Sequence, residues 1–181
     1  MKINTFFLTI LISSAILLSA CGPKAASTPQ GSASLAQALP NLAYPIEAAS
    51  SGIAQLTDGL FEESAAPGSA VMIRIQLGQN RAFGDINADG AEDAALTLVV
   101  DSSGSGTFTY LAAVLDQNGT YQALPAVFLG DRITVQSLSI QPGQVVVDLL
   151  TRAADEPMSA DPTVAETLTF KLSSDQLVAA E

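Results

Sequence analysis

One short stretch of the chain, residues 84–93, concentrates carboxylate and amide side chains that could bind a metal ion. Counted from Asp85, oxygen donors stand at the first, third, fifth, seventh and ninth positions: Asp85, Asn87, Asp89, the backbone carbonyl of Ala91, and Asp93. Calcium binds six to eight hard oxygens, and alternate residues of a tight loop can point toward one centre. Gly90, at the sixth position, permits the sharp turn that such a loop needs. The spacing therefore predicts a calcium site.

The same loop fits a second interpretation, in which no ion is bound. Asp and Asn side chains accept hydrogen bonds from backbone groups two residues on, so the loop could be a metal-free hairpin stabilised by Asx-turns. Crowded carboxylates repel each other without a cation, which favours the calcium site. The twelfth position is Leu96 rather than the bidentate Glu of an EF-hand, so we expect weak binding. Both interpretations stay open at this point.

Composition excludes several kinds of chemistry. The 181-residue chain has no His, which removes Ser-His-Asp and Cys-His nucleophiles and His-based metal sites. It has 18 acidic and 7 basic side chains, for a net charge of -11. Nucleic-acid binding needs a basic surface that releases counterions from the phosphates. We therefore expect no nucleic-acid partner.

Residues 1–20 have the layout of a secretory signal peptide. Lys2 gives a positive start, the stretch Phe6–Leu18 is apolar, and small residues follow it. The apolar stretch is shorter than the roughly 20 residues of a membrane-spanning helix. Leu18-Ser19-Ala20-Cys21 resembles the lipobox of bacterial lipoproteins, which implies that Cys21 becomes the first mature residue and carries lipid on its sulfur and amino group. The alternative is an ordinary signal-peptidase site with an incidental thiol.

Cys21 is the sole Cys of the chain, so it has no internal disulfide partner, and lipidation accounts for its presence. Removal of residues 1–20 takes away one basic residue, Lys2, and no acid, which leaves a net charge of -12. Anionic headgroups repel such a chain, so the covalent lipid has to anchor it to the membrane. We expect a lipoprotein of the bacterial cell envelope that faces the periplasm or the exterior.

Residues 21–40 are predicted to be the lipidated Cys and a flexible linker. Small and polar residue types dominate this segment, although Leu35 and Leu39 stand at helical spacing. Residues 41–181 are predicted to form one compact antiparallel β domain, because turn signals recur between short apolar runs. Thr107–Leu115 is apolar on both faces, which is typical of a central strand.

The remaining strands and turns follow from the same patterns. The other predicted strands are Ile53–Leu56 and Leu60–Glu63 (a small hairpin around Thr57-Asp58-Gly59), Val71–Leu77, Leu96–Val100, Ile133–Ile140, Val145–Thr151 and, as the last strand, Val164–Leu172. Tight turns are predicted at Asn118-Gly119 and at Gln141–Gln144. A change of parity within Ile133–Ile140 predicts a β-bulge near Gln136–Leu138.

Two resemblances to known families add to this. Gly84–Val100 resembles the strand-loop-strand calcium motif of FG-GAP repeats, but a single copy implies neither their propeller nor its ligand-binding role. The region from Gly84 to Leu172 also resembles the β module of bacterial lipoproteins that sometimes accompany a META domain, a family that implies no activity. The matching residues are Gly84–Ala95, Gly104–Leu115, Leu129–Ile133 and Gln136–Ile140.

Two classes of function are compatible with these features. The first is a lipid-anchored envelope protein whose β domain is non-catalytic, acts by binding or as structure, and is stabilised by calcium; its partner in the envelope is not specified by the sequence. The second is a carboxylate-dependent hydrolase that uses Asp and Glu pairs, for which Asp155, Glu156 and Asp161 are further candidates. A pocket with two carboxylates of opposed pKa favours the hydrolase, and a flat sheet face favours the first class.

Overall fold

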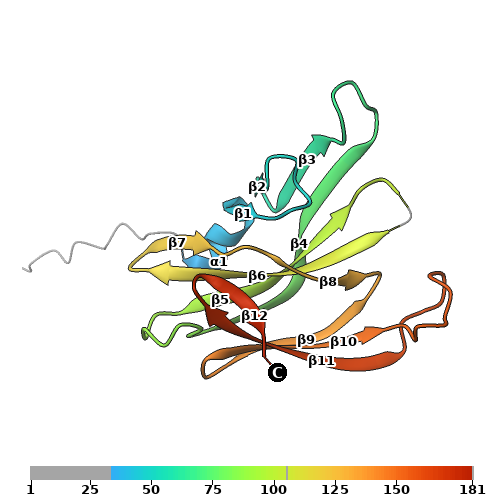
Figure 1. Cartoon of the computed structure of the whole chain (residues 1–181). Helices are drawn as coiled ribbons and strands as arrows, with labels where there is room; N and C mark the ends of the chain where they lie inside the picture. Colours follow the sequence, from blue (N-terminus) through green and yellow to red (C-terminus); the bar gives the residue numbers. More distant parts are fainter. Residues whose placement is uncertain (1–33, 105, 181) are drawn as a thin grey trace, which may run out of the picture. The chain divides into compact units, whose positions relative to one another are not determined.

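The structure is a computed structural model and describes residues 34–104 and 106–180 (Figure 1). It is mainly β with antiparallel strand pairs, which confirms the predicted fold class. Within the described residues, no helix is long and apolar enough to span a bilayer. The elements are α1 (Leu35–Ala38), the 3₁₀ helix η1 (Leu39–Asn41), β1 (Ala43–Pro45), β2 (Ile53–Gln55), β3 (Leu60–Ser64), β4 (Met72–Gly84), β5 (Asp93–Asp101), β6 (Thr107–Gln117), β7 (Thr120–Ala123), β8 (Val127–Asp131), β9 (Thr134–Gln141), β10 (Gln144–Thr151), β11 (Val164–Ser173) and β12 (Gln176–Ala179).

The strands form three sheets rather than a single one. A six-stranded sheet has the order β3-β4-β5-β6-β7, and β8 pairs with β6 beside β7. A four-stranded sheet has the order β12-β11-β10-β9, and β1 pairs with β2. In Figure 1 the orange and red strands of the four-stranded sheet form a separate layer from the green and yellow strands of the six-stranded sheet.

The central strand β6 is buried on both faces, as its sequence predicts. Its side chains from Tyr110 to Leu115 are all buried and alternate between two hydrophobic clusters. Tyr110, Ala112 and Val114 belong to the first cluster. The second cluster contains Leu111, Ala113 and Leu115. Because successive side chains of a strand point to opposite faces, each cluster lies on one face of the six-stranded sheet.

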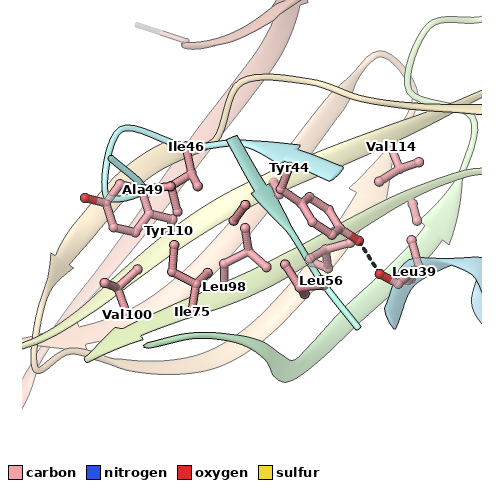
Figure 2. Close-up of a cluster of buried hydrophobic side chains, with 14 of the residues drawn as sticks. Leu39, Tyr44, Ile46, Ala49, Leu56, Ile75, Leu98, Val100, Tyr110 and Val114 are labelled. Atoms are coloured by element: carbon pink, nitrogen blue, oxygen red, sulfur yellow. Dashed lines mark hydrogen bonds between the residues drawn. The ribbon is translucent and has the colours of Figure 1, made fainter. Parts of the chain in front are cut away.

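The first cluster is covered by residues 35–56, here called the N-terminal cover. Leu35 and Leu39 are buried in it, together with Tyr44, whose hydroxyl donates a hydrogen bond of 2.8 Å to the carbonyl of Leu39 (Figure 2). The sequence predicts that the linker extends to residue 40, whereas the folded part already begins with α1 at Leu35. The helical spacing of the two leucines was the signal for this, because it places both on one side of a short helix.

The second cluster lies between the six-stranded and four-stranded sheets. Val145, Val147 and Leu149 of β10 contribute buried side chains to it. The Gln141–Gln144 turn joins β9 to β10, with φ of 73° at Gly143, as predicted. The predicted bulge is also confirmed, since Ser137 pairs with Asp148 while Val135 pairs with Leu149, which leaves Gln136 without a cross-strand partner.

Other local predictions are confirmed only in part. Asn118 and Gly119 have φ of 56° and 85°, as a tight turn between β6 and β7 requires. The turn at Thr57-Asp58-Gly59 also forms, but β2 pairs with β1 and β3 pairs with β4, so the expected small hairpin is wrong. The predicted strand Val164–Leu172 forms as β11, but it is not the last strand, because β12 follows it and pairs with it.

Strand β4 contains a bulge that depends on a glycine. Leu77 pairs with Leu98 and Arg81 pairs with Leu96, so three residues of β4 stand opposite Thr97 alone. A Cβ atom added to Gly78 would lie 2.0 Å from Oγ1 and 2.9 Å from the backbone oxygen of Thr97. Thr97 is buried, so its backbone has little room to move away. Only glycine fits this part of the bulge without a displacement of β5.

We expect Gly78→Ala to destabilise the protein by about 1–3 kcal/mol, because the added methyl group overpacks a buried strand pair. Gly104→Ala is the matched control, since the nearest atom to its new Cβ is the Ser102 hydroxyl at 3.8 Å. Denaturant unfolding of both variants measures the difference. Equal midpoints for the two variants would show that β4 and β5 separate easily at the bulge.

Candidate functional site

The acidic loop predicted to bind calcium connects β4 to β5. Asp93, its ninth position, is already the first residue of β5. The loop is fixed to the domain by Ile86, which is 2% exposed and belongs to the second cluster. Ala88 and Gly90 have φ of 63° and 86°, so the chain turns twice through the left-handed region between Ile86 and Asp93.

The exposed half of the loop is stabilised by hydrogen bonds to its own backbone. The Asp85 carboxylate accepts the N–H groups of Asp89 (3.2 Å) and Gly90 (2.9 Å). Asn87 Oδ1 accepts the Asp89 N–H at 3.0 Å, and Asp89 Oδ1 accepts the Ala91 N–H at 2.8 Å. These last two are Asx-turns, which is the geometry of the metal-free alternative.

Asp89 remains at the surface, and its hydrogen bonds affect its ionisation. The Ala91 N–H and the Asn87 side-chain amide both donate to its carboxylate and hold the pKa of Asp89 below its usual range. The ionised form is therefore favoured over a wide pH range. An ionised, exposed carboxylate in this position is available to a cation.

Asp93 has a different environment, because its side chain is fully buried. Its Oδ2 atom accepts the Ile86 N–H at 2.9 Å, and its Oδ1 atom accepts the Asp116 N–H at 2.9 Å. Burial raises the pKa of Asp93, and these backbone hydrogen bonds partly oppose the shift. Asp93 therefore joins the acidic loop to the start of the β6–β7 turn.

Asp116 continues this connection into the turn. Its Oδ1 atom accepts the Gly119 N–H at 2.5 Å, while its own N–H binds Asp93. The sequence alone does not predict this role of Asp93 or Asp116. A signal was present for Asp93, since it precedes the buried strand residues Ala94 and Ala95 and has the parity of Ala95, which faces the second cluster.

The five predicted calcium ligands therefore fit the ion only in part. Asp85, Asn87, Asp89 and the carbonyl of Ala91 belong to the outer part of the loop, whereas the side chain of Asp93 is fully buried beneath it. In the part of the chain that the structure describes, no three acidic or thiol side chains converge as a metal-binding group. Calcium bound here would need water molecules to complete its six to eight oxygens.

A shallow pocket of about 350 Å³ lies beside the loop. Its walls are the start of the acidic loop and the β9–β10 turn, and its lining residues are Gly84, Asp85, Ala88, Ile140, Gln141, Pro142 and Gly143. Asp85 is the one ionisable residue among them. The pocket thus brings the first position of the loop next to a second turn, which the sequence did not predict.

The other predicted site residues are not near this pocket. Asp155, Glu156 and Asp161 lie in the loop between β10 and β11 and are exposed. The Arg152 guanidinium fixes this loop by donating to the Ala160 carbonyl at 2.5 Å and to the Arg132 carbonyl at 2.9 Å. Cys21, the predicted lipidation site, lies outside the described residues.

We expect Asp93→Asn to destabilise the protein by about 1–3 kcal/mol, because the amide NH₂ replaces an acceptor and leaves a buried backbone N–H unpaired. Asp89→Asn is the matched control and should have a much smaller effect, since Asp89 is exposed and binds only its own loop. Thermal melts in chelator measure both without a contribution from calcium. Similar losses for the two variants would mean that Asp93 does not stabilise the connection to β6.

Comparison with known proteins adds no assignment for this loop. No family model, no curated protein and no solved structure matches the chain. The resemblances of its sequence to a lipobox, to FG-GAP loops and to the module of META-associated lipoproteins stay predictions.

Proposed function

We propose that the chain is a lipid-anchored bacterial envelope protein with a non-catalytic β domain that acts by binding or as structure. The anchor in this proposal is the lipid on Cys21, supported by the Leu-Ser-Ala-Cys sequence that ends a signal-peptide pattern. The observation that carries the non-catalytic role is the use of the loop carboxylates. Asp85, Asn87 and Asp89 hydrogen-bond to the loop backbone, and Asp93 is buried beneath them.

A hydrolase would need two accessible carboxylates with different proton affinities. Asp89 and Asp93 do differ, because hydrogen bonds lower the pKa of Asp89 and burial raises that of Asp93. However, Asp93 is fully buried and both its oxygens accept backbone N–H groups, so it has no contact with a substrate. The pocket beside the loop is lined by a single carboxylate residue, Asp85. These features favour the binding or structural role.

Calcium belongs to the proposal as a stabiliser of the loop. Asp85, Asn87, Asp89 and the carbonyl of Ala91 would hold the ion, which would supply positive charge between carboxylates that otherwise repel each other. Asp93 acts as a support of the loop rather than as a ligand, since its side chain is fully buried and binds the backbone of Ile86 and Asp116. With four protein donors and no twelfth-position Glu, we expect an affinity on the order of 10⁻⁴ to 10⁻³ M, as in extracellular calcium modules.

Lipidation is tested by replacing the sole thiol. Cys21→Ser should abolish labelling with radioactive fatty acid and leave the precursor uncleaved or released from the membrane fraction. The control moves the thiol within the predicted linker by combining Cys21→Ser with Ser27→Cys, which should also prevent labelling if the Leu-Ser-Ala context is needed. Labelling and membrane association that persist in Cys21→Ser would disprove the lipoprotein assignment.

Calcium binding is tested by thermal melts of the purified chain in chelator and in calcium. Calcium at about 100 times its dissociation constant should add roughly 2.7 kcal/mol of stability, because only the folded loop presents the donor set. Magnesium should add less, since it demands octahedral geometry and holds its waters tightly. Asp89→Ala should remove the calcium response, whereas Glu92→Ala, an exposed acid of the same loop that is not a predicted ligand, should keep it. Identical melts in chelator and in millimolar calcium would leave the loop a metal-free hairpin.

A further inference from the structure

The pocket beside the acidic loop lies where two distant segments of the chain meet. Gly84, at the end of β4, lies so close to Ile140 of β9 that a Cβ atom added to Gly84 would be 3.0 Å from Ile140 Cγ2. This contact places the start of the acidic loop next to the β9–β10 turn, and the pocket of about 350 Å³ lies between them. Ile140 also packs against the second cluster, so the pocket is on the side of β4 that faces the four-stranded sheet.

Asp85 gives this pocket its charge. One of its carboxylate oxygens accepts the Asp89 N–H at 3.2 Å, and the other accepts the Gly90 N–H at 2.9 Å. These bonds fix the orientation of the carboxylate and leave further acceptor positions on both oxygens, since a carboxylate has about four in all. Among the described residues, no basic side chain lies within 4.0 Å of Asp85. The pocket therefore contains an oriented negative charge to which the described part of the chain supplies no counter-ion.

The two basic residues nearest to the pocket along its own strands point elsewhere. Arg81 precedes Gly84 on β4, but it pairs with Leu96, which faces the first cluster on the other side of the sheet. Lys171 of β11 follows the buried Phe170, which packs in the second cluster, so Lys171 projects from the outer face of the four-stranded sheet. The pocket is thus acidic, and charge complementarity favours a cationic ligand.

The walls and the size of the pocket narrow this choice. Ala88, Ile140 and Pro142 supply apolar surface beside the carboxylate. The volume is at the lower end of the roughly 300–1,000 Å³ of small-ligand sites, which suits one side chain rather than a cofactor. A guanidinium group is planar, weakly hydrated, able to bind both oxygens of a carboxylate, and carried on an apolar stem. An ammonium group is more strongly hydrated, so arginine fits this pocket better than lysine.

We propose that the pocket binds an arginine side chain of a partner protein, with the guanidinium on Asp85 and the stem against Ile140 and Pro142. The pocket is shallow, so the side chain enters it and the partner's backbone stays outside. This proposal rests on the binding role proposed above and names the class of its ligand. Asp85 is also a proposed calcium ligand, so calcium and arginine weaken each other's binding, and the arginine site is best measured in chelator.

The test is an NMR titration of the full-length protein, labelled with ¹⁵N and purified in non-ionic detergent. The probe is the blocked peptide Gly-Ser-Gly-Arg-Gly-Ser-Gly, added in chelator at physiological ionic strength, which screens general attraction to the acidic chain. Saturable shifts should be confined to the backbone amides around the pocket, in residues 84–88 and 141–144. The same peptide with citrulline, a neutral analogue of arginine, should cause no saturable shift, and the lysine peptide should bind more weakly than the arginine peptide.

Variants of the pocket test the role of its charge. Asp85→Asn should weaken binding of the arginine peptide by about fivefold or more, whereas Glu92→Gln, which removes an exposed charge outside the pocket, should weaken it by less than about twofold. Asp85→Asn also removes an acceptor of the loop N–H groups, so a second pair of variants is placed at Ala88. Ala88→Lys should weaken binding and Ala88→Glu should strengthen it, each by roughly threefold. Both variants place a side chain at the same φ of 63°, so altered folding cannot produce opposite effects.

The outcomes separate this inference from the proposed function. Equal shifts with the arginine and citrulline peptides, or equal losses in Asp85→Asn and Glu92→Gln, would overturn the arginine site. Binding of free arginine without binding of the peptide would make the ligand a small molecule and overturn the partner protein. No binding of the arginine peptide by a protein that is still labelled with fatty acid at Cys21 would overturn this inference alone. Peptide binding by an unlabelled, soluble protein would overturn the lipid anchor alone.

Discussion

The architecture depends on one constraint, which is that the central strands β5 and β6 carry buried side chains on both faces. Neither face can be left in water, because burial of a Leu or Val side chain stabilises the folded state by about 1.5–3 kcal/mol relative to leaving it exposed. The domain therefore needs two separate covers, and the chain supplies them from opposite ends. The four-stranded sheet of the C-terminal part covers one face, and residues 35–56 cover the other.

The burial of Asp93 follows from the same constraint. β5 begins at this residue, and its parity directs the carboxylate toward the face that is covered by the second cluster. A buried carboxylate is costly unless its oxygens are hydrogen-bonded. The acidic loop and the start of the β6–β7 turn satisfy it with the N–H groups of Ile86 and Asp116. The same residue thus sets the position of the loop and joins it to the next hairpin.

The patterns that were predicted correctly are those set by neighbouring residues. The Asn118-Gly119 turn, the Gln141–Gln144 turn and the bulge at Gln136 are each determined by backbone preferences or by side-chain parity over a few positions. The errors concern partners that are distant in sequence. Strand β2 pairs with β1 rather than across the turn at Thr57-Asp58-Gly59, because the cover must pack its buried face, including Ala54, on the first cluster.

In the candidate site, too, the sequence predicts the local contacts but not the contacts between residues that are distant in sequence. The Asx-turns of Asn87 and Asp89 are local, so the spacing of the loop was sufficient to suggest them. The second partner of Asp93 comes from β6, 23 residues later, and a linear pattern of oxygen donors does not contain it. Spacing therefore identified a loop of the right shape but assigned Asp93 to the outer set of oxygens, whereas tertiary packing places it underneath.

The position of the N-terminal cover in the chain has a consequence for folding. Residues 35–56 are synthesised before the strands that they cover, and the first cluster also needs Val114 near the end of β6. Leu39, Tyr44 and Leu56 therefore cannot complete their packing until about 60 more residues have followed. Closing such a distance costs more entropy than forming a tight turn, and chains dominated by distant contacts fold in roughly milliseconds to seconds. We expect the docking of the cover, rather than the formation of its turns, to set the rate at which a newly made chain becomes resistant to proteolysis.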